Sequence, residues 1–421
     1  MFRDIVKTTF WSASGKSIGF LVPFFIAAWF GVSGSTDVFF FAYGIIIYLS
    51  GIFSNSIESS IVPFIAEVRS RDEKQVGFFV GKVLTIGVVT FLIAGAIFLT
   101  ISRPLLGIVT NFSSWQLTFL LKILTEMLPL LILLIATSIL SGVLNAYKIF
   151  IFPAVLPAFR AAVILSAIFS LKSKIGVHAI ALGYVLGEAF RLCILWSTVL
   201  HRKLFSIRFS LVFDTESLNF LKTFSHLVIG LAALGLNSII DKVMASWLQE
   251  GSVSVLEYAD RLYMIPVALL SSGFIVTTLS HWSKTYYENG GNKELFKEKI
   301  MRAAKLLLVV SLAVTIFLAV FSKPLIGFVY GYGQFPKDRL AEVRWVWLAY
   351  LAGFAPFTLC QLFVIRRLVM KETLVPMKIA LIMNILNVAL NLILMRVIGL
   401  PGIALATSIT YLVADLLYLI L

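Results

Sequence analysis

The stretch IGVHAIALG at residues 175–183 returns as IGLPGIALA at residues 398–406, 223 positions later. Two further pairs keep nearly the same spacing: Lys148 and Pro153 with Lys371 and Pro376, and SRPLLGIV from Ser102 with SKPLIGFV from Ser322. Three matches in one order indicate an internal duplication. Each half of the chain is therefore expected to contain the same set of structural elements.

The chain is strongly apolar along its whole length. Hydrophobic residues make up 60% and charged residues only 13%, with a mean hydropathy of +0.98. A soluble domain needs more charge to face water, and apolar runs of about 20 residues match the thickness of a bilayer. The sequence predicts an all-α polytopic membrane protein with about twelve transmembrane helices, near residues 9–30, 38–66, 77–101, 119–146, 150–171, 176–200, 222–249, 252–281, 303–329, 343–370, 374–397 and 399–421.

The duplication divides these spans into two sets of six. An even number of spans returns the chain to its starting side, so the halves are parallel repeats around a central cavity. We predict an N-terminal lobe over 1–203, a cytoplasmic linker over 204–221 and a C-terminal lobe over 222–421. This layout is typical of transporters that expose one site alternately to either side of the membrane.

Loop charges predict the orientation. With the N-terminus inside, the inner loops contain more than twice as many Lys and Arg residues as the outer loops, so both termini are expected in the cytoplasm. These charges account for much of the formal net charge of +14. They are scattered over short loops, which excludes the continuous basic face that a nucleic-acid partner requires.

Four segments carry a family resemblance: GKSIGFLVPFFIAAWFGVSGSTDVFFFAY at 15–43, IVPFIAE at 61–67, DKVMASWLQEGSVSVLEYADRLYMIPVALL at 241–270 and YGYGQF at 330–335. In these the chain resembles the lipid II flippases of the MurJ (MviN) family. The resemblance implies a multi-pass protein of the bacterial plasma membrane, not an enzyme. It would move a polyprenyl-diphosphate-linked glycan, with cell-wall synthesis proteins as partners.

Two cations are predicted near mid-membrane, where an unpaired charge is costly. Lys16 lies about 12 Å into the first span and Arg261 about 14 Å into the eighth. A pyrophosphate needs such cations, and Arg binds its oxygens in a bidentate way. The alternatives are a structural pair of Arg261 with Asp260 or Glu257, and of Lys16 with Glu58.

The resemblance is incomplete at the expected substrate pocket. The family has an arginine where this chain has Val22, and another in the second span, where the run from Tyr43 to Glu58 contains no cation. Arg160 and Arg191 could compensate for the missing charge. Their alternative is a pairing inside the lobe with Glu188.

A second group of residues has the chemistry of an alkali-cation site. Asn387 and Asn391 are four residues apart on one predicted helix face, and Asp241 and Thr407 are expected at a similar depth. In the resembling family a sodium ion is held at the matching positions: Asp241, Asn387, Asn391, Thr407 and the carbonyl of Ile403. The alternative is an Asp241–Lys242 pair with Asn–Asn hydrogen bonds between helices.

Three functions remain open from the sequence. The first is the flippase, and the second is a cation-coupled exporter of small amphiphiles or drugs. The third is a transport-inactive scaffold that binds partners through its 281–305 loop. No glycine-rich phosphate loop occurs, so this chain is not expected to bind ATP as its energy source. No covalently bound cofactor is expected either, and the ion proposed from the resemblance is sodium.

Overall fold

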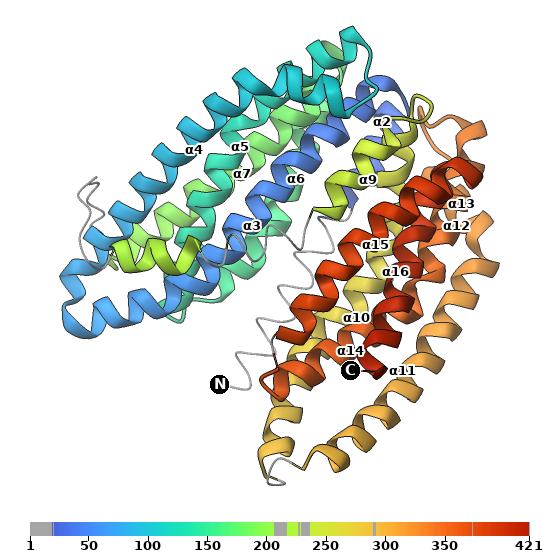
Figure 1. Ribbon diagram of the computed structural model, residues 1–421. Helices are drawn as coiled ribbons and strands as arrows, with labels where there is room; N and C mark the ends of the chain where they lie inside the picture. Colours follow the sequence, from blue (N-terminus) through green and yellow to red (C-terminus); the bar gives the residue numbers. More distant parts are fainter. Residues whose placement is uncertain are drawn as a thin grey trace. The chain divides into compact units, whose positions relative to one another are not determined.

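The computed structural model describes residues 19, 21–205, 217–225, 228, 236–288, 292–372 and 374–420. Every element in this described part is a helix (Figure 1). The helices form two compact units. The first unit contains the described residues up to Ile26 and from Gly34 to Ile239, and the second contains Ala27–Ser33 and Ile240 onward.

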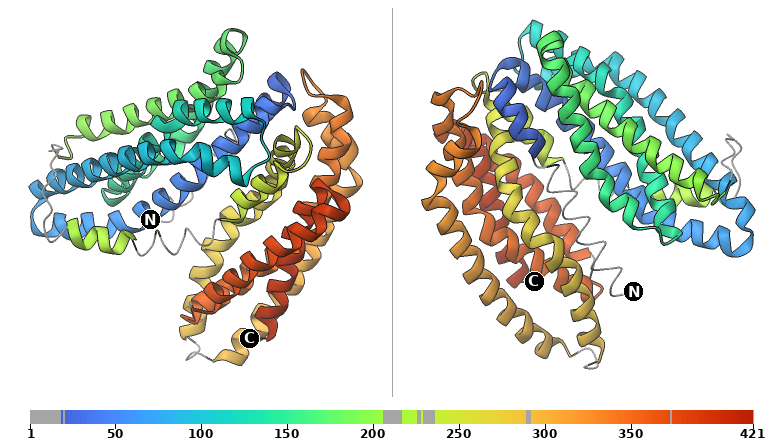
Figure 2. Two further views of the ribbon diagram at one scale, coloured as in Figure 1. Left: turned by 45° about the horizontal axis from the view of Figure 1, so that its top comes forward. Right: turned by 180° about the vertical axis from the view of Figure 1, so that it is seen from behind.

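The first unit is a bundle of long helices that run side by side (Figures 1 and 2). In this bundle α5 packs against α3, α4 and α7, and α6 packs against α7. Its apolar core joins the inner faces of α3, α4 and α5. The helices are α3 (Gly34–Arg71), α4 (Glu73–Val109), α5 (Ser114–Ala146), α6 (Ile151–Ile175) and α7 (His178–His201), after α2 (Leu21–Phe30), which ends in the second unit.

Two glycines let α6 and α7 approach closely. Gly183 and Gly187 are four residues apart on α7 and face α6, the small-xxx-small spacing of tightly packed membrane helices. A Cβ on Gly187 would lie 2.5 Å from the Ile164 side chain and 3.0 Å from the Arg160 carbonyl oxygen. The backbone of α7 therefore packs directly on α6 at the level of Arg160.

The second unit is also helical, and α16 lies at its centre. α13, α14 and α15 pack on α16, while α10 packs on α13 and α14 (Figures 1 and 2). The helices are α9 (Asn237–Ala245), α10 (Ser252–Glu288), α11 (Lys293–Val320), α12 (Ser322–Tyr330), the short 3-10 helix η1 (Lys337–Arg339), α13 (Leu340–Ala352), α14 (Phe354–Val369), α15 (Leu374–Ile398) and α16 (Leu400–Ile420).

Residues 27–33 belong to the second unit although they precede α3 in the chain. The Tyr258 hydroxyl donates to the carbonyl of Gly31 at 2.8 Å, and the Gln334 N–H donates to the carbonyl of Ala28 at 2.8 Å. Gly333 has a φ of 66°, and a Cβ there would collide with the Ala28 carbonyl. Residues 27–33 therefore pack against the YGYGQF motif at 330–335.

The duplication is visible in the backbone. Lys148 and Lys371 both adopt left-handed φ angles, of 59° and 60°, and end their helices with the same set of hydrogen bonds. Gly176 and Gly399, also 223 positions apart, have φ angles of 58° and 68°, and each accepts a hydrogen bond from the N–H three residues later. The predicted two-repeat layout is confirmed, whereas the lobe boundaries at 203 and 222 stay predictions.

Nine helical segments in the described part are long and apolar enough to cross a membrane. Of the other three predicted spans, 9–30 and 222–249 include residues outside the described part, and 252–281 lies within α10. On α4, Ile93, Ile97, Ile101 and Leu105 form an exposed stripe with a four-residue spacing. Such an apolar face is stable against lipid tails and not against water, which makes this a multi-pass membrane protein.

Two predicted spans are broken where the sequence suggested continuous helices. The span at 303–329 divides into α11 and α12, and Pro324 there has no N–H to donate to Val320. The span at 343–370 divides at Gly353, beside which the Ser408 hydroxyl donates to the Ala349 carbonyl at 2.6 Å. A hydroxyl from α16 thus donates a hydrogen bond to a backbone carbonyl near the end of α13.

We expect Gly187→Ala to lower the melting temperature of the purified protein. The added Cβ must push α7 away from α6, a distortion that costs about 1–3 kcal/mol. Gly51→Ala is the matched control, because a Cβ on Gly51 meets no atom within 4 Å. A Gly187→Ala variant that melts with the wild type would show that the helices do not approach this closely.

Candidate functional site

The buried carboxylate of Glu257 holds two cations in the second unit. From α9, the Lys242 ammonium donates to Glu257 Oε2, and one turn along α10 the Arg261 Nε donates to Oε1 at 2.8 Å. The Glu257 side chain is 3% exposed, Lys242 10% and Arg261 27%. Two cations on one carboxylate leave this cluster with a formal charge of +1, and Arg261 is its most accessible member.

The predicted substrate residues are only partly within the described structure. Arg261 pairs with Glu257, as the structural alternative expected, and not with its neighbour Asp260. Asp260 is half-buried and makes no hydrogen bond or ion pair inside the described part of the chain. Lys16 and the side chain of Glu58 lie outside the described residues, so their pairing stays a prediction.

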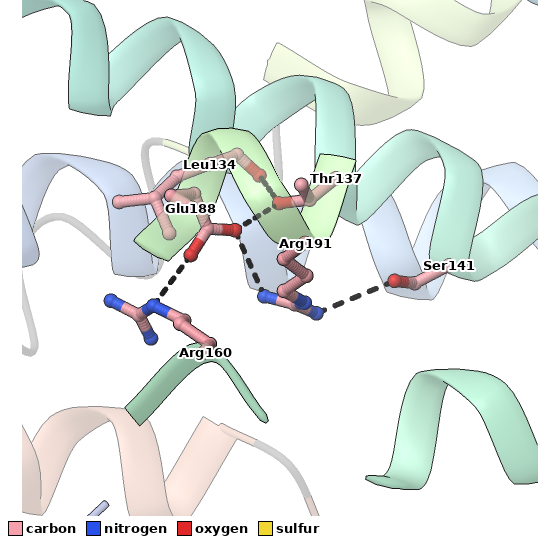
Figure 3. Close-up of polar contacts among 6 residues, drawn as sticks. All are labelled: Leu134, Thr137, Ser141, Arg160, Glu188 and Arg191. Carbon is pink, nitrogen blue, oxygen red and sulfur yellow. Dashed lines mark hydrogen bonds and ion pairs between the residues drawn. The ribbon is translucent and has the colours of Figure 1, made fainter. Parts of the chain in front are cut away.

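The first unit contains a similar cluster, at positions unrelated by the repeat, around Glu188, which is fully buried (Figure 3). Its two oxygens lie 2.7 Å from Arg160 Nε and 3.1 Å from Arg191 Nη1. The pairing inside the lobe that the sequence suggested as an alternative therefore occurs. Arg160 and Arg191 are 20% and 14% exposed, and the cluster again has a formal charge of +1.

Two hydroxyls complete this cluster, and sequence reasoning missed both. Thr137 donates to Glu188 Oε1 at 2.6 Å, and Ser141 accepts a long hydrogen bond of 3.4 Å from Arg191 Nη2. They are four residues apart on α5, so they face α7 together (Figure 3). A Thr-x-x-x-Ser spacing inside an apolar helix was the available signal.

The residues of the oxygen-rich group lie together in the second unit, joined by a chain of hydrogen bonds. The Asn391 amide donates to Asp241 Oδ1 at 2.6 Å and to Asn387 Oδ1 at 3.2 Å. Asn387 in turn donates to the Thr407 hydroxyl at 3.2 Å, which lies 3.5 Å from the Ile403 carbonyl oxygen. Asn391 Oδ1 is buried and has no hydrogen-bond partner within the described part.

The expected alternative for this group is half right. The Asn–Asn hydrogen bond is present, but it lies within α15 and not between helices. The ammonium of Lys242 contacts Glu257, while the Asp241 carboxylate faces Asn391. The Asp241 carboxylate is therefore hydrogen-bonded to the amide group, while the ion pair of Lys242 is with Glu257.

Neither the oxygen-rich group of the second unit nor the Glu188 cluster of the first unit is repeated in the other half of the chain. The positions 223 residues before Asn387 and Asn391 are Ile164 and Ile168, both buried and apolar. Glu188 corresponds in the same way to Tyr411, and Arg191 to Ala414. The two repeats share their turns and differ in their polar interiors.

Comparison with known proteins identifies the family. A family model described as "Lipid II flippase MurJ" matches residues 26–421. The chain belongs to the MurJ family. It is 26% identical to a probable lipid II flippase MurJ of Buchnera aphidicola subsp. Acyrthosiphon pisum, over 97% of this chain and 81% of that protein. A Rickettsia prowazekii protein with the same description is also 26% identical, with the same coverage of both chains.

Solved structures agree on the fold. A lipid II flippase MurJ in an inward closed conformation matches with a TM-score of 0.85 and 22% identity, covering 100% of this chain and 87% of that chain. An inward-facing multidrug resistance transporter of the MATE family matches with a TM-score of 0.76 and 15% identity, covering 98% and 93%. The MurJ family consists of transporters, so the chain is not an enzyme.

Glu188 should be the most sensitive polar residue of the first unit. Glu188→Gln leaves two arginines inside the lobe without a counter-charge, which we expect to cost about 3–5 kcal/mol of stability. Glu188→Gln with Arg160→Gln should recover part of that loss. Thermal unfolding measures both, with Glu67→Gln as control, since its pair with Arg71 is exposed. Equal melting of Glu188→Gln and the control would contradict this role.

Proposed function

We propose that this protein moves a polyprenyl-diphosphate-linked glycan precursor, lipid II or a relative of it, across the bacterial plasma membrane by alternating access. The match of the MurJ family model to residues 26–421 is the observation that carries the proposal. The relatives that support it are themselves described as probable lipid II flippases.

The two charge clusters are suited to such a substrate. The Glu188 cluster has a surplus positive charge. In the second cluster Arg261 is the most accessible cation, although the carboxylates of Asp260 and Asp241 act on the same cations as Glu257. Arg160 lies about 14 Å along α6 and Glu188 about 15 Å along α7, near the middle of both helices. A diphosphate at that depth would find cations there although Val22 stands where the family has an arginine. We propose Arg261, Lys16, Asp260 and Glu58 as substrate-site residues, with Arg160 and Arg191 in support.

The finer points of location and partners belong to the same proposal. The charge balance of the loops favours both termini in the cytoplasm. A protein that delivers a wall precursor would work beside cell-wall synthesis proteins, which are the partners we propose.

The deciding experiment is replacement of a native flippase. A bacterial host depleted of its own lipid II flippase should resume wall synthesis when this chain is expressed. An exporter of small amphiphiles would instead confer resistance to dyes or drugs without rescuing the wall, and a scaffold would do neither. Absence of rescue, with the protein inserted at normal levels, would contradict the proposal.

Arg261→Ala should reduce transport of lipid II in proteoliposomes by on the order of thirtyfold or more, because a desolvated charge partner of the phosphate is lost. The Lys242–Glu257 pair remains, so the variant should still fold. Arg261→Lys should recover only part of the activity, since the bidentate fork is missing. Arg302→Ala, an exposed arginine paired with Glu298, is the control. Normal transport by Arg261→Ala would remove Arg261 from the site.

We further propose that Asp241, Asn387, Asn391, Thr407 and the carbonyl of Ile403 hold a sodium ion. These are hard oxygen donors with one carboxylate, and the buried Asn391 Oδ1 has no hydrogen-bond partner in the described part of the chain. An alkali cation would satisfy that oxygen and offset the Asp241 charge. The ion would supply a coupling charge and would join α9 to α15 and α16.

Sodium should raise the melting temperature of the purified protein. An ion that binds only the folded state adds RT ln(1 + [L]/Kd) to the free energy of unfolding. Asp241→Asn should abolish this dependence, and Asn391→Asp, which adds a second charge, should move it to lower sodium concentration. Asp338→Asn, at an exposed position, is the control. If the melting temperature is the same in sodium as in a bulky organic cation, these residues bind no sodium and only form hydrogen bonds between helices.

A further inference from the structure

Four helix ends meet around one pocket of the first unit. α3 ends at Arg71, α4 begins at Glu73, α5 ends at Ala146 and α7 ends at His201, at the end of the bundle where α3 turns into α4 (Figure 1). The pocket has a volume of about 1060 Å³. Charged and aromatic side chains from these helix ends line it, among them Arg69, Lys74, Tyr147, Arg202 and Lys203.

The pocket has surplus positive charge. Four of its lining residues are cations and two are acids, and both acids already have partners in the fold. Asp72 caps α4 by accepting from the Lys74 N–H at 2.9 Å, and Glu73 accepts from Arg69 Nε at 3.1 Å. The ammonium and guanidinium groups of Lys74, Arg202 and Lys203 are exposed and form no ion pair within the described ranges.

Two donors are held in place at the wall of the pocket. The Arg69 guanidinium lies over the Tyr147 ring at 4.3 Å, in addition to its contact with Glu73. The Tyr147 hydroxyl is buried and has no hydrogen-bond partner in the described part of the chain. Burial raises the pKa of Tyr147, so the phenol keeps its proton and remains a donor. An acceptor from outside the protein would satisfy it.

Apart from Gln75, the rest of the lining is apolar. Phe78, Leu204 and Phe205 contribute to it, with the Tyr147 and Phe205 ring centroids 6.0 Å apart. The pocket also lies where the apolar spans of α4, α5 and α7 end, which is the level of the lipid headgroups. Cations next to aromatic side chains at this level fit a ligand with an anionic head and an apolar body. A free inorganic ion would use only the cations.

We propose that this pocket binds the phosphate headgroup of an anionic phospholipid, with Arg69, Lys74, Arg202 and Lys203 around the phosphate and Tyr147 donating to it. Basic pockets between the ends of membrane helices bind lipid headgroups in this way. The site lies within the first unit and does not depend on the transported substrate.

The test is lipid retention by the purified full-length chain, measured by native mass spectrometry with phosphatidylglycerol, phosphatidylcholine or inorganic phosphate as the probe. The wild type should retain phosphatidylglycerol over phosphatidylcholine. Arg202→Gln with Lys203→Gln should weaken phosphatidylglycerol binding tenfold or more. Lys172→Gln with Lys174→Gln removes two charges at the last turn of α6 and should leave binding unchanged.

Tyr147→Phe separates binding from folding. It removes only a hydroxyl that forms no hydrogen bond within the described structure, so it should melt at or above the wild type while binding phosphatidylglycerol several-fold more weakly. Unchanged phosphatidylglycerol binding in both pocket variants would overturn the site. Equal affinity for inorganic phosphate and the lipid would overturn the assignment to a phospholipid.

Discussion

A carboxylate inside an apolar helical lobe is stable only when cations close around it, and this constraint governs both units. Glu188 and Glu257 are each nearly inaccessible and each contact two basic side chains. Removing either carboxylate from water costs several kcal/mol, which only close pairing and hydrogen bonds offset. The helices that supply those cations must therefore approach closely, and at Arg160 the bare backbone of Gly187 permits this.

The repeats show which parts of a duplicated membrane fold are free to change. The helix ends at Lys148 and Lys371 and the turns at Gly176 and Gly399 have kept the same backbone conformation. A left-handed turn sets the direction in which the next helix enters the membrane, so changing it would disturb the whole lobe. A buried polar group concerns only its immediate neighbours. One unit accordingly has an Arg–Glu–Arg cluster, and the other an amide and carboxylate group.

Much of this architecture could be predicted from the sequence, and the limits are physical. Apolar length predicted the spans and the repeated motifs predicted the duplication, because both can be read from local sequence. The pairing of Arg261 was predicted only as an alternative, because Glu257 and Asp260 both lie within a turn of it and spacing cannot choose between them. Thr137 and Ser141 were missed, since hydroxyls on apolar helices usually bond their own backbone. The helix break at Gly353 involves Ser408 of another helix, and the sequence around Gly353 alone cannot predict that contact.

The packing of residues 27–33 within the second unit has a consequence for biosynthesis. Gly31 accepts its hydrogen bond from Tyr258, a residue made more than two hundred positions later. At ordinary elongation rates of about 5–20 residues per second, this segment waits on the order of ten to forty seconds for its partner. The early helix must enter the bilayer, and the first unit can assemble beside it, before the segment is bound. Expression as two separate halves would therefore leave the second half without a piece of its own interior.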